Sequence, residues 1–262
     1  MKAAPFEYLR AASLDEAVEA LATDNARVLA GGQSLVPLLN MRRARPSLLV
    51  DINRLDLAHI RYDDGWLELG ALTRHRAAET SELVRRHTPL LAEALRYIGN
   101  VTIRNRGTIG GSLAHADSAA ELPAVAVALD AEITARGPGG ERVIAARDFF
   151  TGPFTTALDR GELLTKVRFP QHKHAAVREL TRRSTDLAVV AAFVADGRIA
   201  VAGAGPTPIR AVEVEQALRA GEPIAEAVRR LVTDPPGDVH APAEYRREMA
   251  MVLVRRALEG SA

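Results

Sequence analysis

The sequence predicts an α+β fold, and three observations support this prediction. Short apolar runs, which are typical of buried strands, alternate with helical periodicity through about residue 55. Further along, strand-like segments lie in pairs around turn sequences such as Asp63-Asp64-Gly65 and Asp196-Gly197, which indicate antiparallel hairpins. From about residue 210 to the end, apolar residues recur mainly at helical spacing. The chain therefore combines helices with several separate groups of strands.

Residues 1–55 are predicted to form a small α/β unit. Ser13 and Glu16 have the spacing of a capping box, which predicts a helix over residues 14–22. Two buried strands are expected at residues 28–30 and 48–52.

The middle of the chain alternates hairpins with helices. Thr73 is expected to cap a helix that runs toward Arg86, and Pro89 to begin another that ends near Tyr97. Pro123 begins a short helix over residues 124–129. The strands expected in this part share β-branched or alternating apolar residues: 60–62, 66–70, 132–136, 142–146 and 163–169.

A polar linker at residues 171–174 marks the predicted boundary of the last part of the chain. Its two histidines, His172 and His174, are expected on the surface, because they lie two residues apart and lack further metal ligands. Strands are expected at residues 176–180, 191–195 and 198–202, and helices at 210–220, 224–232 and 243–259. The apolar face of the last helix is predicted from Tyr245, Met249, Val252 and Leu253.

Composition excludes several classes of protein. The chain has 262 residues, a net charge of +1 and no cysteine. A protein without cysteine holds no disulfide, no thiolate-bound iron–sulfur cluster and no cysteine nucleophile. The near-neutral charge gives no reason to expect nucleic acid, and no stretch approaches the roughly 20 apolar residues of a membrane helix. Residues 1–7 lack the apolar run of a signal peptide, so we expect a cytoplasmic protein.

The first candidate site is the stretch that follows the strand at residues 28–30. Two adjacent glycines let another molecule approach the backbone closely, and exposed N–H groups with a serine hydroxyl suit a phosphate oxygen. A tight turn without a ligand is the alternative. The residues expected to contact a ligand are Leu29, Ala30, Gly31, Gly32, Gln33, Ser34 and Leu35.

A second stretch repeats this chemistry. It comprises Thr108, Ile109, Gly110, Gly111 and Ser112. Two glycine loops in one chain suit a ligand that carries a diphosphate, with one loop on each side of it. Together they outweigh the reading of each loop as a simple turn.

Two further side chains follow the second loop. His115 is a candidate ligand contact, with packing as the alternative. Glu121 is a candidate acceptor for ribose hydroxyls, although a carboxylate there also suits the start of a helix.

The glycines at 203 and 205 are not a dinucleotide fingerprint, because Pro206 and Pro208 prevent a helix. No nucleophile and base are placed by spacing, so a bound cofactor is expected to carry any chemistry.

The two glycine loops and their flanks resemble the FAD-binding subunits of the molybdenum hydroxylases. The resemblance is strongest to the medium subunits of aerobic carbon monoxide dehydrogenase and more distant to the FAD domain of xanthine dehydrogenase. It covers nearly the whole chain and is carried by the segments at residues 6–8, 30–34, 49–52, 103–112, 146–149, 161–164 and 243–246.

The resemblance implies a two-subdomain FAD-binding fold of the vanillyl-alcohol-oxidase-like (PCMH) type. Subdomains at about 1–55 and 56–171 would hold FAD between them, without a covalent bond. Residues 172–262 would form a C-terminal subdomain, a three-stranded sheet with helices, which closes over the flavin. The pyrophosphate would lie on residues 30–34 and 108–112.

The resemblance also implies roles for single residues outside the loops. Glu121 matches a position that contacts the adenosine ribose, and the backbone of Leu164 one that meets the adenine. Leu187 falls where the carbon monoxide enzymes have an aromatic residue against the flavin ring. The chain departs from the family pattern at Gln33, Ser112 and Glu121, which stand where His, Asn and Asp are frequent.

The family implies a relay of electrons. A large partner subunit would oxidise the substrate at a molybdenum–pterin centre, and a small partner would carry two 2Fe-2S clusters. This chain would take the electrons onto FAD and deliver them to an external acceptor, in a dimer of heterotrimers. The alternatives are a stand-alone FAD-dependent reductase of the same fold and an assembly protein that has lost the flavin; the intact glycine pairs disfavour the latter.

Overall fold

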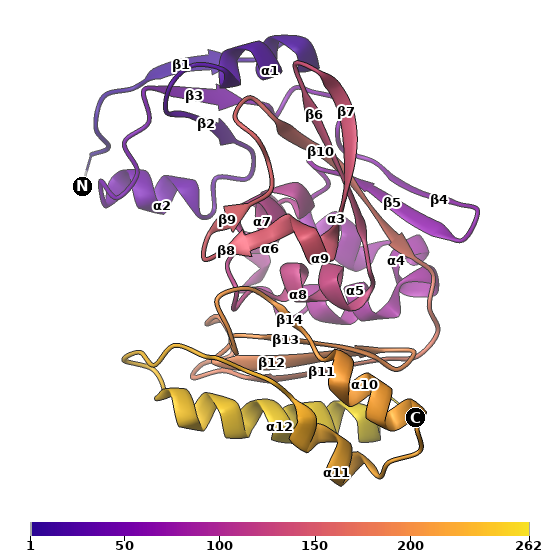
Figure 1. Ribbon diagram of the computed structural model, residues 1–262. Helices are drawn as coiled ribbons and strands as arrows, with labels where there is room; N and C mark the ends of the chain where they lie inside the picture. Colours follow the sequence, from indigo (N-terminus) through magenta and orange to yellow (C-terminus); the bar gives the residue numbers. More distant parts are fainter. Residues whose placement is uncertain (1, 262) are drawn as a thin grey trace.

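The computed structural model describes residues 2–261 and contains the expected groups of strands and helices (Figure 1). The N-terminal unit lies at one end and the last helices lie at the other. Within residues 2–261, no helix combines the length and the apolar character needed to cross a membrane.

The N-terminal unit is a parallel three-stranded sheet in the order β1-β3-β2. It comprises β1 (Glu7–Arg10), β2 (Ala26–Leu29) and β3 (Leu48–Asp51), with α1 (Leu14–Leu21) and α2 (Leu35–Asn40) in the two crossovers. Ser13 Oγ accepts a hydrogen bond of 3.1 Å from the Glu16 N–H, so the predicted helix start is confirmed. The parallel order brings the carboxyl ends of β2 and β3 to the same edge of the sheet.

The second sheet has five antiparallel strands in the order β4-β5-β10-β6-β7. Its strands are β4 (Ile60–Asp63), β5 (Trp66–Gly70), β6 (Glu132–Gly137), β7 (Gly140–Ala145) and β10 (Leu163–Pro170). Asp64 and Gly65 both have positive φ, +44° and +79°, as a two-residue hairpin requires. A separate small hairpin comprises β8 (Phe150–Gly152) and β9 (Thr155–Thr156).

Seven short helices connect and cover these strands. They are α3 (His75–Thr80), α4 (Glu82–His87), α5 (Pro89–Leu95), α6 (Val101–Arg106), α7 (Ile109–His115), α8 (Glu121–Ala128) and α9 (Ala146–Phe149). The prediction of one helix from Thr73 to Arg86 is wrong. Ser81 is extended and its hydroxyl caps a new helix, α4, while the Thr73 hydroxyl donates to the His59 carbonyl oxygen instead of capping α3.

The C-terminal sheet is packed on both faces. Its strands are β11 (Ala175–Leu180), β12 (Val190–Ala195), β13 (Arg198–Ala202) and a fourth strand of two residues, β14 (Ile209–Arg210), that the sequence did not reveal. Side chains alternate along β12: Phe193 joins the core around α5 and α8, and Val194 joins the core under the last helices. Both layers are visible in Figure 1. This double burial explains why β12 is apolar throughout.

The last helices are α10 (Val212–Arg219), α11 (Ile224–Ala227) and α12 (Ala243–Gly260), with a 3-10 turn at Val228–Arg230. The predicted apolar face of α12 is displaced. Tyr245 is 43% exposed, and the buried position beside it belongs to Arg246, whose guanidinium donates to the Val189 carbonyl oxygen and to Asp238. The prediction that Tyr245 is buried is therefore wrong, and a paired arginine is buried next to it.

The prediction of a surface position for His172 is also wrong. The side chain is buried, and its Nε2 accepts a hydrogen bond of 3.0 Å from the Leu90 N–H at the start of α5. That bond satisfies an N–H of the first helical turn, which has no partner within the helix. The linker at residues 171–174 is thus fixed to the helical layer.

Candidate functional site

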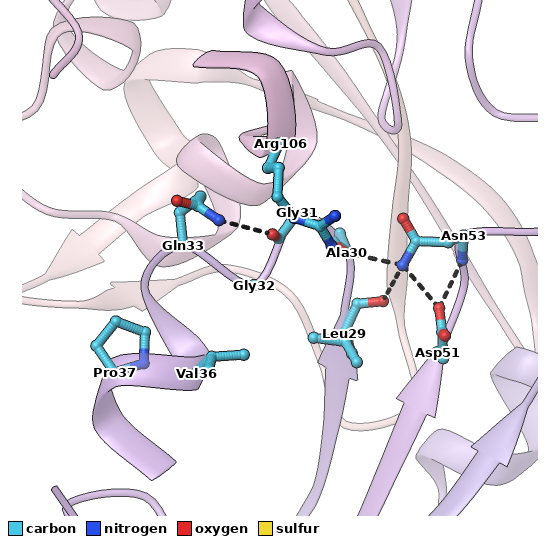
Figure 2. A pocket seen from close by; sticks show the side chains of 10 residues that line it. All are labelled: Leu29, Ala30, Gly31, Gly32, Gln33, Val36, Pro37, Asp51, Asn53 and Arg106. Atoms are coloured by element: carbon cyan, nitrogen blue, oxygen red, sulfur yellow. Dashed lines mark hydrogen bonds between the residues drawn. The ribbon is translucent and has the colours of Figure 1, made fainter. Parts of the chain in front are cut away.

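The first glycine loop has carbonyl groups bound by the protein and N–H groups that remain available. Asn53 Nδ2 donates to the Ala30 carbonyl oxygen at 2.9 Å, and Gln33 Nε2 donates to that of Gly31 at 3.2 Å (Figure 2). Within residues 2–261, no protein acceptor takes a hydrogen bond from the N–H groups of residues 31–34. Four successive backbone donors can therefore bind an anionic ligand.

At Gly31 the first glycine loop meets the end of α6, just before the second glycine motif. A Cβ atom at this position would lie 2.3 Å from the Arg106 carbonyl oxygen, so only glycine allows the backbones to approach so closely. Arg74 holds the same junction, because its NH1 donates to the Arg106 carbonyl oxygen and its NH2 donates to Asn53 Oδ1 at 2.7 Å. The end of α6 is thereby fixed against the first loop.

A pocket of about 440 Å³ opens at this junction (Figure 2). Backbone, apolar and charged groups from three segments form its walls. The lining residues are Leu29, Ala30, Gly31, Gly32, Gln33, Val36, Pro37, Asp51, Asn53 and Arg106.

The second glycine motif is a helix in the structure, where we expected a loop. Residues 109–115 form α7, capped by the Thr108 hydroxyl, which accepts from the Gly111 N–H at 3.1 Å. The Gly110 N–H donates to the Ala71 carbonyl oxygen at 2.9 Å, and the Ser112 N–H donates to that of Thr108. These N–H groups are already paired, so the second motif differs from the first in what it offers a phosphate.

The buried side chain of His75 contacts two residues of the second motif. Its Nε2 lies 2.9 Å from the Thr108 carbonyl oxygen and 3.1 Å from Ser112 Oγ. A carbonyl oxygen only accepts, so Nε2 carries the hydrogen. Burial lowers the pKa of His75 to about 4, which keeps the ring neutral near pH 7. Gly107 is close by: a Cβ there would lie 2.7 Å from His75 Nδ1.

We expect the His75→Ala substitution to destabilise the chain by about 2 kcal/mol at pH 7, because it leaves a cavity and removes the donor to Thr108. The contribution of His75 to the stability of the wild-type chain should also fall as the pH falls from about 6.5 toward about 4, since the unfolded histidine gains a proton first. The variant should lack this part of the acid sensitivity. Urea unfolding between pH 4 and pH 8 measures both effects.

The His174→Ala variant, which alters an exposed histidine, is the control for this measurement. Equal stability of the His75→Ala and wild-type chains would show that the ring does not hold the second motif.

The remaining predicted site residues lie in four places. His115 packs against Phe154 with ring centroids 5.1 Å apart, and Leu164 is buried in β10. Leu187 lies in the segment between β11 and β12 and is 54% exposed. Glu121 is buried at the start of α8, where burial and then the charge of Asp117 raise its pKa to about 7. Their contacts with a cofactor stay predictions.

Sequence reasoning missed several residues that line the pocket, above all Asp51, Asn53 and Arg106. Two signals were available. Asn53 follows the predicted strand at residues 48–52, and Arg106 lies two residues before the second glycine motif. Each becomes a site residue only because the parallel sheet and Gly31 bring three distant segments together.

Known families match both parts of the chain. The FAD binding domain in molybdopterin dehydrogenase matches residues 4–172, and the CO dehydrogenase flavoprotein C-terminal domain matches residues 175–261.

Individual proteins match over nearly the full length. Subunit alpha of the 6-hydroxypseudooxynicotine dehydrogenase complex of Paenarthrobacter nicotinovorans is 44% identical over 98% of this chain and 95% of its own length. The carbon monoxide dehydrogenase medium chain of Afipia carboxidovorans is 36% identical over 97% of this chain and 96% of its own. The structure of carbon monoxide dehydrogenase from Hydrogenophaga pseudoflava matches with a TM-score of 0.95 and 34% identity, covering 100% of this chain and 98% of that one.

Proposed function

The chain belongs to the family of FAD-binding medium subunits of the molybdenum hydroxylases, and from that premise we propose how its residues serve electron transfer. It is an oxidoreductase subunit with an FAD-binding domain. We propose that it holds FAD non-covalently and passes electrons from the 2Fe-2S clusters of a small partner subunit to an external acceptor.

The observation that carries this proposal is the set of open N–H groups at Gly31–Ser34 beside the pocket. Their donors suit the diphosphate of FAD, and the loop carbonyls, which would repel it, are bound by Asn53 and Gln33. We assign residues 29–35 to the diphosphate and its surroundings, and residues 108–112 to the opposite side.

The other predicted contacts complete the proposed site. Glu121 would accept hydrogen bonds from the adenosine ribose, the backbone of Leu164 would meet the adenine, and Leu187 would border the flavin ring. His115, braced by Phe154, would lie beside the second motif. When bound, FAD supplies the means to accept and release electrons; this chain supplies the donors that hold it and the walls that limit water.

The chain is proposed to work in a larger assembly. A large subunit with a molybdenum–pterin centre and the small iron–sulfur subunit would complete a heterotrimer, and two heterotrimers would pair. We place this assembly in the cytoplasm. We also propose a division into an FAD-binding part at 1–171, itself of two subdomains, and a C-terminal part at 172–262; the separate sheets support it. The relatives at 44% and 36% identity are named for different substrates, so we propose no particular substrate for the complex.

The test is an absorbance spectrum of the purified chain before and after heating. Flavin bands that move into the supernatant, with the mass of FAD, are the expected result. Flavin that stays with the precipitated protein would contradict non-covalent binding. A chain that is colourless, both alone with added FAD and in complex with the two partner subunits, would overturn the flavoprotein proposal.

A further inference from the structure

Arg106 carries a positive charge that the protein leaves uncompensated at the edge of the pocket. Its side chain is exposed and, within residues 2–261, makes neither a hydrogen bond nor an ion pair. Figure 2 shows it reaching from the end of α6 toward Ala30 and Gly31. Its backbone is held in place, because Arg74 binds the carbonyl oxygen and Gly31 packs against it. The guanidinium is thus tethered to a fixed point beside the glycine loop.

The nearby charges do not neutralise Arg106. The pKa of Arg74 is lowered, first by burial and second by the positive charge of Arg106, which lies close to it. Asp51, the carboxylate in the pocket, is already engaged: it accepts from Tyr8 and from Asn53 at 2.7 Å, and Arg10 lies 3.7 Å away. The pocket is therefore lined by the guanidinium group of Arg106, with that of Arg74 nearby, and by an acid whose charge is shared with other partners.

The two arginines differ in how many donors they keep for a ligand. Arg74 donates one hydrogen bond from NH1 and one from NH2 to the protein, whereas within residues 2–261 none of the five N–H donors of the Arg106 guanidinium has a protein acceptor. A planar guanidinium beside several open backbone N–H groups suits a phosphate better than a carboxylate, because phosphate offers more acceptor oxygens and more charge.

We propose that Arg106 is a binding residue for the diphosphate of FAD and contributes a charged contact in addition to the backbone donors of Gly31–Ser34. This inference rests on the proposed function. The competing explanation is a solvated surface arginine, and the two differ in what substitution does to ligand affinity.

The experiment compares the FAD affinity of the full-length wild-type chain, Arg106→Gln and Arg106→Lys after removal of bound flavin. Flavin fluorescence gives the Kd as a function of salt. We expect Arg106→Gln to raise the Kd about 10- to 100-fold, which is the equivalent of one hydrogen bond to a charged group. The dependence of the Kd on salt should weaken, and Arg106→Lys should recover part of the affinity, since it keeps the charge but loses the planar fork.

Two controls isolate the diphosphate. Riboflavin has no phosphate, so its affinity should be the same in wild type and Arg106→Gln. Arg96, which is exposed at the end of α5, provides a matched variant, Arg96→Gln, that should bind FAD like the wild type. Thermal unfolding of apo Arg106→Gln should match that of the wild type, because the Arg106 side chain has no hydrogen bond or ion pair to lose among the residues that the structure describes.

The outcomes separate this inference from the proposed function. If the wild type binds FAD and Arg106→Gln binds it within about twofold, the role of Arg106 is overturned and the flavoprotein proposal stands. If the wild type binds no FAD, inorganic pyrophosphate becomes the probe. If the wild type binds pyrophosphate and Arg106→Gln does not, Arg106 belongs to an anion site and the flavoprotein proposal is overturned. If the wild type binds no pyrophosphate either, the role of Arg106 and the flavoprotein proposal are both overturned.

Discussion

The Gly31→Ala substitution should raise the Kd for FAD roughly 100-fold. The added methyl group would lie 2.3 Å from the Arg106 carbonyl oxygen and 3.0 Å from the Gly107 Cα, and both are backbone atoms that cannot rotate away. Relief requires the first loop to separate from the end of α6. Overpacking of this kind costs about 1 to 3 kcal/mol, and each 1.4 kcal/mol is about a factor of ten in affinity.

The measurement pairs FAD titration with urea unfolding of the apo chain. Gly139→Ala is the matched control, because a methyl group there would meet no atom within 4 Å. We expect the control to bind FAD normally and Gly31→Ala to lose both affinity and stability. If Gly31→Ala binds FAD as the wild type does, the contact between the two motifs is not what shapes the site.

The glycines of the second motif serve close packing and not the exposure of backbone donors, and the sequence alone could not predict this difference. A Cβ at Gly110 would lie 2.6 Å from the Ala71 Cβ, so this glycine allows α7 to pack on the chain just after β5. The two Gly-Gly pairs look alike in the sequence, yet one leaves open donors and the other closes a packing contact. The difference depends on Ala71, which is far away in the sequence.

Features that depend on neighbouring residues were predicted well, whereas contacts between residues far apart in the sequence were missed. The Asp196-Gly197 turn forms as expected, with φ of +45° and +77°, because two adjacent residues decide it. His172 and Arg246 were misplaced because their partners, the Leu90 N–H and the Val189 carbonyl oxygen, are 82 and 57 residues away. The residue patterns and the family resemblance both led to the predicted division near residues 55 and 171, whereas the predicted role of each part in FAD binding came from the resemblance alone.

Two buried carboxyl groups lie where the C-terminal sheet packs on the helical layer. Glu121 begins α8, and Glu179 belongs to β11, on the strand face that carries Val177 into the core around α5. Both Glu179 carboxylate oxygens are buried without a hydrogen-bond partner in the part of the chain that the structure describes. Burial, and then the charge of Glu121, raise the pKa of Glu179 to about 8. The pKa of Glu121 is itself raised to about 7, mainly by burial.

These shifts predict that the two carboxyl groups stabilise the apo chain less as the pH rises. Both groups hold a proton more tightly in the folded chain than in the unfolded chain, where glutamate titrates near 4.5. Their contribution to the free energy of unfolding therefore falls between about pH 4.5 and about pH 8, as ionised carboxylates accumulate at a buried boundary. Glu179→Gln removes one titrating group and keeps the shape, so it should be more stable than the wild type at pH 8.5 by about 1 to 2 kcal/mol, a figure reduced for partial solvent access.

Urea unfolding at pH 5 and pH 8.5 measures this effect, and Glu141→Gln, at an exposed carboxylate on β7, is the control. Near pH 5 the wild type and Glu179→Gln should be nearly equal, because the native carboxyl group is then protonated and neutral like the amide. The gap should open only as the pH rises, which a simple packing change would not produce. A gap of the same size at both pH values would mean that Glu179 acts through packing and not through its charge.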